Sequence, residues 1–154
     1  DDVLAGVEFQ RRIEEKAFKA GGGDYSAPIQ RLGDFMEGRV SEKEGEVHHS
    51  YRPGTRFADL NDVLPEFVCD SIKEAIPALG RKLRGFELPD AIMTGAETRS
   101  SSPVRIVRDD SGQSVSLKGL YPTGEGAGYA GGIVSAAVDG VRQAENIIQE
   151  RINK

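Results

Sequence analysis

Apolar residues recur at the spacing of an amphipathic helix in three stretches of the chain. Residues 4–20 form the first stretch, which three consecutive glycines follow. Residues 64–83 form the second, and Pro77 predicts a kink or break in it, because proline lacks an amide proton and crowds the preceding turn. Residues 133–151 form the third. Its apolar and small residues lie on one stripe that we expect to be buried against a sheet: Ile133, Ala137, Gly140, Val141, Ala144 and Ile148.

Shorter patterns lie between these helices. Three segments are apolar or alternate in the manner of short strands: residues 91–94, 104–107 and 120–121. In residues 26–38, Ser26 is suited to cap a short helix and Pro28 to occupy its first turn, with Gly38 after its last residue. The chain is therefore expected to adopt an α+β fold with three or four helices and a few short strands.

Composition and charge narrow the class of protein. The chain has 154 residues, 38% hydrophobic and 29% charged, as in a soluble globular domain. A net charge of -5 argues against nucleic acid or an anionic membrane as the main partner, because both attract basic surfaces. Cys69 is the only cysteine, which excludes an internal disulfide, and the sequence contains no long apolar run. We expect a cytoplasmic protein in which Cys69 has a packing role.

No metal site is predicted. His48 and His49 are adjacent, so in an extended segment their side chains point to opposite faces. The sequence supplies no second cluster of Cys or His at ligand spacing. Both histidines are interpreted as loop residues.

The glycine-rich segment of residues 119–132, GLYPTGEGAGYAGG, precedes the last helix and contains six glycines in fourteen residues. Gly126, Gly128 and Gly131 match the GxGxxG spacing of a dinucleotide-binding turn. That motif requires a second strand after the helix, and the sequence here continues as helix instead. Two interpretations stay open: a loop that grips a nucleotide, and a turn that lets a small-residue helix pack closely on a sheet.

A second informative segment is GAETRSSSPVRI, which starts at Gly95. An arginine and several hydroxyl groups precede Pro103, and such groups are costly to bury unless they are hydrogen-bonded. The segment is either a solvated loop or part of a polar ligand site.

These two segments resemble the carboxyl-terminal end of bacterial FAD-dependent, NAD(FAD)-utilising dehydrogenases. Those enzymes are part of the glutathione-reductase-like flavoprotein group. In the glycine-rich segment the resemblance continues into the last helix, as GLYPTGEGAGYAGGIVSAAVDGVRQAENII. The resemblance implies that Glu125 accepts hydrogen bonds from the ribityl hydroxyls of FAD. It also implies that backbone amides near the start of the last helix face the pyrimidine end of the flavin ring. The implied cofactor-binding residues are Gly124, Glu125, Gly126, Ala127, Gly131, Gly132 and Ile133. Arg99, Ser101, Ser102 and Arg105 are implied near the substrate pocket.

The resemblance also implies how the chain is divided. Residues 1–110 would be part of an insert or substrate domain, and residues 111–154 would be the last strand and helix of a FAD-binding domain. No glycine-rich strand-turn-helix unit for the ADP half of FAD precedes residue 64. We therefore expect a fragment of a flavoprotein that binds FAD weakly or not at all by itself and exposes apolar surface where the rest of the parent chain packs. Self-association through that surface is a further expectation.

Two classes of function follow. In the first, the parent protein is an oxidoreductase that transfers hydride between a nicotinamide or small organic substrate and FAD, with NAD(P)H as a candidate electron donor. In the second, the chain is a non-redox module that binds a small anion or a protein. Neither interpretation nominates a catalytic acid or base.

Overall fold

The computed structural model describes residues 2–152. The chain forms two compact units. We call Gln10–Ala96 the sheet unit, and Asp1–Phe9 together with Glu97–Lys154 the glycine-loop unit. Each unit is described by itself below.

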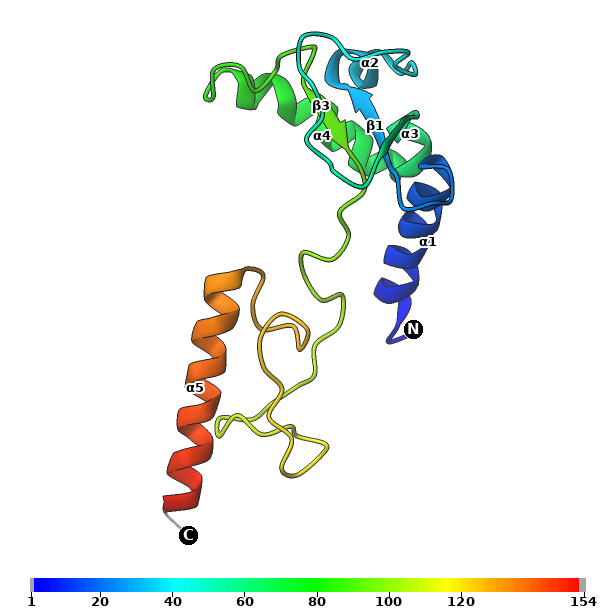
Figure 1. The fold of residues 1–154 in the computed structure, drawn as a ribbon. Helices are drawn as coiled ribbons and strands as arrows, with labels where there is room; N and C mark the ends of the chain where they lie inside the picture. Colours follow the sequence, from blue (N-terminus) through cyan, green and yellow to red (C-terminus); the bar gives the residue numbers. More distant parts are fainter. Residues whose placement is uncertain (1, 153–154) are drawn as a thin grey trace. The chain divides into compact units, whose positions relative to one another are not determined.

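The expectation of an α+β fold is confirmed (Figure 1). Residues 2–152 contain five helices and a three-stranded mixed sheet. In chain order the elements are α1 (Ala5–Ala20), β1 (Ala27–Arg31), α2 (Leu32–Glu37), β2 (Thr55–Phe57), α3 (Leu60–Val63), α4 (Glu66–Gly80), β3 (Ile92–Thr94) and α5 (Ile133–Ile152).

The sheet has the order β2-β1-β3, with β1 parallel to β2 and antiparallel to β3. The predicted helix over residues 26–38 is therefore wrong in its first half, because the central strand β1 occupies it. Pro28 has no amide proton to donate, but its carbonyl oxygen accepts a hydrogen bond from the Gly95 amide at 3.0 Å. Pairing on both sides and the burial of Ile29 outweigh the local helix signals. Only the end was predicted correctly: α2 ends before Gly38, which has the positive φ of 71° that favours glycine.

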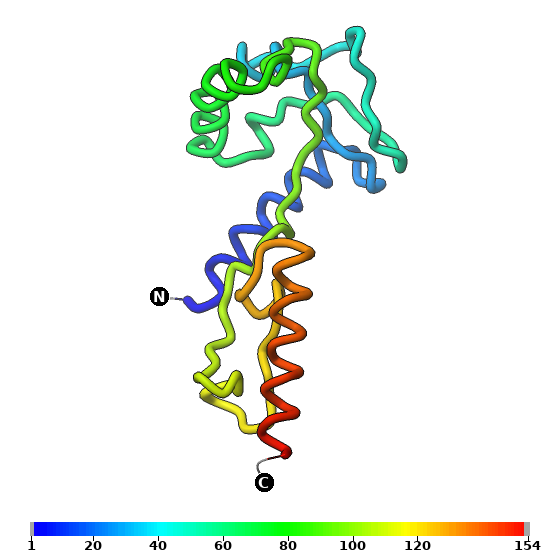
Figure 2. Tube along the Cα trace, turned by 90° about the vertical axis from the view of Figure 1, so that its left-hand side faces the viewer, coloured from blue at the N-terminus to red at the C-terminus, as the bar shows by residue number. Residues whose placement is uncertain are grey.

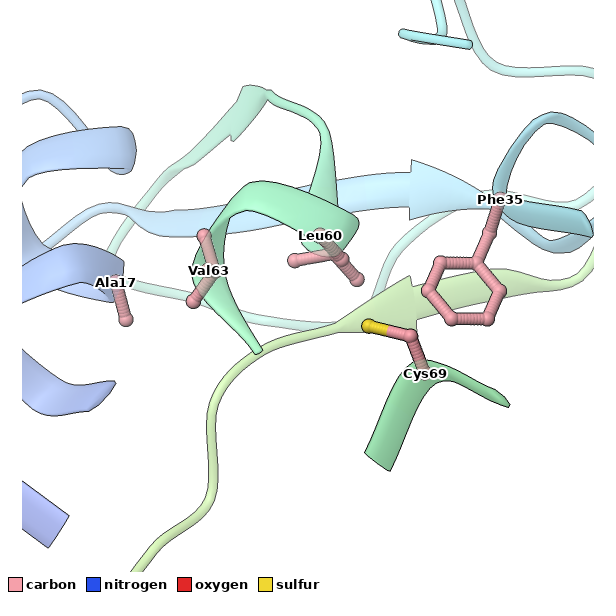
Figure 3. Close-up of a cluster of buried hydrophobic side chains, with 5 residues drawn as sticks. All are labelled: Ala17, Phe35, Leu60, Val63 and Cys69. Atoms are coloured by element: carbon pink, nitrogen blue, oxygen red, sulfur yellow. The ribbon is translucent and has the colours of Figure 1, made fainter. Parts of the chain in front are cut away.

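The core of the sheet unit is a cluster of five side chains (Figure 3): Ala17, Phe35, Leu60, Val63 and Cys69. One side chain comes from α1, one from α2, two from α3 and one from α4, so the cluster joins four helices. Burial raises the pKa of the Cys69 thiol, since the thiolate would lose its hydration. This agrees with a packing role for Cys69.

Helix α4 does not break at Pro77, so of the predicted kink or break the break is wrong. Pro77 lies near the end of the helix, which continues to Gly80. The Pro77 carbonyl accepts a hydrogen bond from the Arg81 amide at 3.4 Å. A proline so close to a helix end removes only one of the hydrogen bonds of the last turn, and the helix tolerates this loss.

In the glycine-loop unit, the predicted last helix is confirmed as α5, which runs alongside the loops of residues 104–124 (Figure 2). The predicted burial of its apolar stripe is wrong within this chain. Ile133 is 91% exposed and Val141 60%, whereas Asp139 and Gln143 are buried. Residues 97–132 offer α5 no sheet, because their only β-pairing is a single bridge between Arg108 and Ser114. The helix consequently turns its polar side toward them.

The strands predicted over residues 104–107 and 120–121 do not form. Pro122 cannot donate to a strand ladder, and the Leu120 carbonyl instead accepts a single hydrogen bond from Ser114 at 2.7 Å. Of the helices that the structure describes, none has the length and apolar character required to cross a membrane.

Candidate functional site

An ion pair fixes the glycine-rich loop to α5. The Arg108 guanidinium donates two hydrogen bonds to the Asp139 carboxylate, at 2.9 and 2.7 Å. The same guanidinium donates to the Pro122 carbonyl at 2.9 Å, and the Gly124 amide donates to Asp139 Oδ2 at 2.9 Å. Chiefly because Arg108 hydrogen-bonds to it, Asp139 has a pKa lowered to about 2. One buried carboxylate thus holds an arginine and a glycine amide in place, and the arginine in turn holds a loop carbonyl.

Tyr129 connects the glycine-rich segment to the residues that follow Pro103. Its ring lies under two guanidinium groups, with centroid distances of 3.7 Å to Arg108 Cζ and 4.9 Å to Arg105 Cζ. Its hydroxyl accepts a hydrogen bond from the Arg108 amide at 3.0 Å, and its own amide donates to the Gly124 carbonyl at 3.0 Å. The residues after Pro103 and the glycine-rich loop therefore share one aromatic contact.

The glycine at position 128 is required by close approach of these segments. Gly128 has a φ of +82°, and a Cβ atom there would lie 2.6 Å from the Val104 carbonyl oxygen. The Arg105 side chain donates from Nε to the Gly128 carbonyl at 3.0 Å, and the Ile106 amide donates to the Ala127 carbonyl at 3.2 Å. A larger residue would push the two backbones apart.

A cavity of about 280 Å³ opens between the same segments. It is lined by Ser101, Ser102, Arg105, Gly128, Tyr129, Ala130 and Gly131. Three of the four residues implied in a substrate pocket, Ser101, Ser102 and Arg105, therefore line one cavity. Arg99 is exposed and does not line it.

The implied cofactor-binding residues fall into two short groups. Gly124, Glu125, Gly126 and Ala127 form a turn in which the Glu125 carbonyl accepts a hydrogen bond from the Gly128 amide at 2.9 Å. The Glu125 side chain is half-buried, and within residues 2–152 its carboxylate has no hydrogen bond or ion pair. An acceptor group is therefore held in the loop without a partner from the described part of the chain.

Gly131, Gly132 and Ile133 lead into α5. The Gly132 amide donates to Ser135 Oγ at 3.2 Å, and the Ser135 hydroxyl donates to the Gly132 carbonyl at 3.0 Å, so a side chain of the first turn caps the helix by reaching back to the residue before it. The amides of Ala130 and Gly131, by contrast, have no hydrogen-bond acceptor among residues 2–152. The Gly132 amide, which is implied to face a flavin, is thus occupied by the cap, while the amides of Ala130 and Gly131 have no acceptor in the described residues.

The sequence motifs do not include the residues that hold the loop in shape. Asp139 carries one signal of a buried polar partner, since it is a lone carboxylate between apolar and small residues of a helix (AAVDGV). Tyr129 carries no signal beyond its place in the glycine-rich segment. The partners of Asp139 come from distant positions in the sequence, which spacing within one helix does not reveal.

The two histidines contact the same carboxylate in the sheet unit. His48 Nδ1 and His49 Nδ1 lie 2.7 and 2.5 Å from the Glu44 oxygens, and the Glu44 pKa is lowered to about 2, mainly by the hydrogen bond from the His49 amide. In residues 2–152, no group of three or more His, Cys, Asp and Glu side chains is arranged to hold a metal ion.

Comparison with known proteins adds two findings. The family described as "FAD-dependent protein, C-terminal domain-like" matches residues 1–100. A Clostridium beijerinckii protein described as "Uncharacterized protein" is 54% identical over 147 residues, which are 96% of this chain and 28% of that relative. The chain thus spans little more than a quarter of the relative's length, and the similarity extends beyond the residues that the family match covers.

Proposed function

Because the chain belongs to the family of FAD-dependent protein C-terminal domains, we propose that it supplies the ribityl and isoalloxazine side of the flavin site in a longer oxidoreductase. The parent enzyme would belong to the glutathione-reductase-like group. It would transfer hydride between FAD and a nicotinamide or small organic substrate, with NAD(P)H as a candidate donor.

The observation that carries this proposal is the state of Glu125. The Glu125 carboxylate belongs to a half-buried residue and accepts no hydrogen bond from residues 2–152, so its acceptor positions are open to a ligand. The hydroxyl groups of a ribityl chain are donors of the kind that such a carboxylate lacks. A phosphate at the same place would be repelled by it. The Glu125 carboxylate, as an acceptor, therefore fits the sugar-alcohol part of FAD better than its pyrophosphate.

The start of α5 supports the same assignment. Helix α5 has 20 residues, and its amino end carries a partial positive charge. When bound, FAD would supply a ring that accepts a hydride and gains negative charge. A helix end fixed before the reaction would stabilise that charge without reorganising.

The shape of the site would be maintained by residues that do not touch the cofactor. Asp139 and Arg108 hold Gly124, the residue before Glu125, through a buried ion pair. Gly128 allows the loop to lie against the backbone at Val104. We assign these three residues positioning roles.

Most of the cofactor contacts would come from the rest of the parent chain. The relative is more than three times as long as the region it shares with this chain, and apolar residues of α5 are exposed here. We therefore expect the 154-residue chain to retain little FAD after desalting, and the parent protein to retain it.

The test is flavin occupancy of the parent protein carrying Glu125→Ala or Glu125→Gln. Glu145→Ala, a change at an exposed position of α5, is the matched control. Loss of one charge-assisted acceptor from a cofactor site is expected to weaken FAD binding about tenfold or more in Glu125→Ala. The affinity of Glu125→Gln for FAD should lie between those of wild type and Glu125→Ala. The FAD-to-protein ratio after desalting measures this. Equal ratios in all four proteins would remove the basis of the proposal.

A protein-binding module is the second candidate, and the exposed side of α5 favours it. Val134, Val138, Val141, Ile148 and Ile152 are all exposed and recur at helical spacing. Unchanged flavin occupancy in Glu125→Ala, combined with loss of a partner upon changes in this stripe, would support that function instead.

A further inference from the structure

The two arginines over the Tyr129 ring differ in one respect that matters for binding. Arg108 has its counter-charge in the fold, since it forms an ion pair with Asp139. Arg105 has none: within residues 2–152 no carboxylate pairs with it. The cavity of about 280 Å³ is lined by Arg105 and by no acidic residue, so its lining carries a net positive charge.

The Arg105 guanidinium is oriented, although the residue is exposed. Its Nε donates to the Gly128 carbonyl at 3.0 Å, and its Cζ lies 4.9 Å from the centroid of the Tyr129 ring. These two contacts leave both terminal nitrogens as donors, because none of the hydrogen bonds within residues 2–152 engages them. Two parallel donors at the end of a fixed guanidinium match the two oxygens of a carboxylate or phosphate.

Backbone donors also line the cavity. The cavity is also lined by Ala130 and Gly131, whose amides have no acceptor among residues 2–152. A Cβ at position 131 would lie 3.2 Å from Ser101 Oγ, so the glycine keeps this wall close to residue 101. The Ser102 hydroxyl is already used, since it donates to the Val104 carbonyl at 2.8 Å. The donors available to a ligand are therefore the Arg105 fork and the two amides.

The geometry points to an oxyanion subsite in this cavity, formed by the Arg105 guanidinium and the amides of Ala130 and Gly131, that binds the carboxylate or phosphate group of an organic substrate. Its identification with a substrate rests on the proposed flavin function. Oxyanion binding itself does not, because all of its groups belong to this chain. The size of the cavity suits one anionic end of a small molecule.

The first experiment titrates the ¹⁵N-labelled chain with sodium acetate and, separately, with sodium phosphate, at ionic strength held constant with sodium chloride. Saturable shifts are expected at the Gly131 and Ala130 amides and at Arg105 Nε. Arg105→Gln should raise the apparent Kd about tenfold or more, which corresponds to one charge-assisted hydrogen bond. Arg84→Gln, an exposed arginine of the sheet unit, loses the same charge and should leave the shifts unchanged. The anion that saturates at lower concentration identifies the ligand group as carboxylate or phosphate.

Shifts that rise linearly with concentration, or that are equal in Arg105→Gln and wild type, would overturn the subsite. Arg105→Lys separates geometry from charge: a fork-specific site loses most of its affinity in this variant, and retention of full affinity would contradict the two-point contact.

The second experiment uses the FAD-loaded parent protein. The anion chosen by the first titration should perturb the visible flavin absorbance saturably, and Arg105→Gln should abolish the change while FAD content stays at the wild-type level. Binding to the chain without any flavin perturbation would overturn the assignment to the substrate. The two proposals fail in different ways. Failure of the flavin proposal would appear as unchanged flavin content in Glu125→Ala. Failure of this inference would appear as an anion-induced absorbance change that is absent in wild type or that persists in Arg105→Gln.

Discussion

Arg108 and Asp139 lie 31 positions apart and form a two-point ion pair, with oxygen-to-nitrogen distances of 2.9 and 2.7 Å. Their side chains are 16% and 11% exposed. Since Asp139 also accepts the Gly124 amide, this pair joins α5 to the loop that carries Glu125. The loop is therefore shaped by side chains of a helix and of an irregular segment, and not by a β-ladder.

Asp139→Asn is expected to loosen the glycine-loop unit. The amide keeps the shape of the carboxylate but leaves the charge of Arg108 uncompensated in a largely buried position. We expect a loss of about 2 kcal/mol, because hydrogen bonds to charged groups contribute about that much and a buried charge without its partner is costly. Amide hydrogen exchange across residues 136–147 measures the change. Asp110→Asn, at an exposed position in the same unit, serves as the control, and equal protection in both variants would contradict the role of the pair.

The same carboxylate predicts how stability depends on pH. Asp139 has a pKa lowered from 3.8 to about 2. A lowered pKa means that the folded state favours the charged form, so the stabilisation is fully present above about pH 4 and is lost as the pH falls toward 2. It corresponds to about 2 kcal/mol. Comparing the exchange protection of wild type and Asp139→Asn at pH 5 and pH 2.5 isolates it: the difference between the two proteins should be much smaller at pH 2.5 than at pH 5. A difference that persists undiminished at pH 2.5 would exclude titration of Asp139 as its source.

Helix positions were largely predictable from the sequence, because α1, α4 and α5 carry long apolar periodicities bounded by glycine or proline. The sequence was a poorer guide to which face of each helix is buried. The stripe on α5 was expected to be buried, and the pattern alone does not say whether the surface that covers it lies in the same chain. β1 was missed because its identity depends on pairing with β2 and β3, which lie about 28 and 65 residues further along.

In the candidate site, too, local motifs were predictable from the sequence and contacts between distant residues were not. The local motifs point to Ser101, Ser102, Arg105 and the glycine loop, and the structure brings these residues together around one cavity. Asp139 and Tyr129, which hold these segments together, act through contacts with residues 15 to 31 positions away. Such contacts leave no spacing pattern in a single sequence.

Gly128→Ala should damage the loop, whereas Gly126→Ala should not. Position 128 combines a φ of +82° with a Cβ that would lie 2.6 Å from the Val104 carbonyl oxygen. The backbone conformation alone costs about 1–2 kcal/mol for a residue with a side chain, and the steric contact adds to it. At position 126 a Cβ would meet no atom within 4 Å and φ is not positive. The measurement is the ¹⁵N–¹H spectrum around residues 104–108. It should change in the first variant only, and a spectrum that is unchanged in both would show that the two backbones are not in contact.

The exposed stripe of α5 predicts association that polar substitution removes. Val141 is 60% exposed and Ile148 57%, and they lie seven residues apart on the same side of the helix. The double variant Val141→Glu, Ile148→Lys keeps the net charge and replaces two β-branched residues by good helix formers. Because neither side chain is buried in this chain, the unfolding temperature of α5, followed by circular dichroism, should be unchanged or slightly raised.

In the parent protein the same double variant should weaken the packing of this chain on the rest of the protein. Faster protease cleavage between the two parts would report this. In the isolated chain, sedimentation should show a lower average mass than for wild type. Glu145→Gln, an exposed polar position between the two substituted residues, should leave the mass unchanged. A marked fall in the unfolding temperature of the double variant, with its mass unchanged, would mean that the stripe is packed within the chain, and the proposed contact with the rest of the parent protein would lose its support.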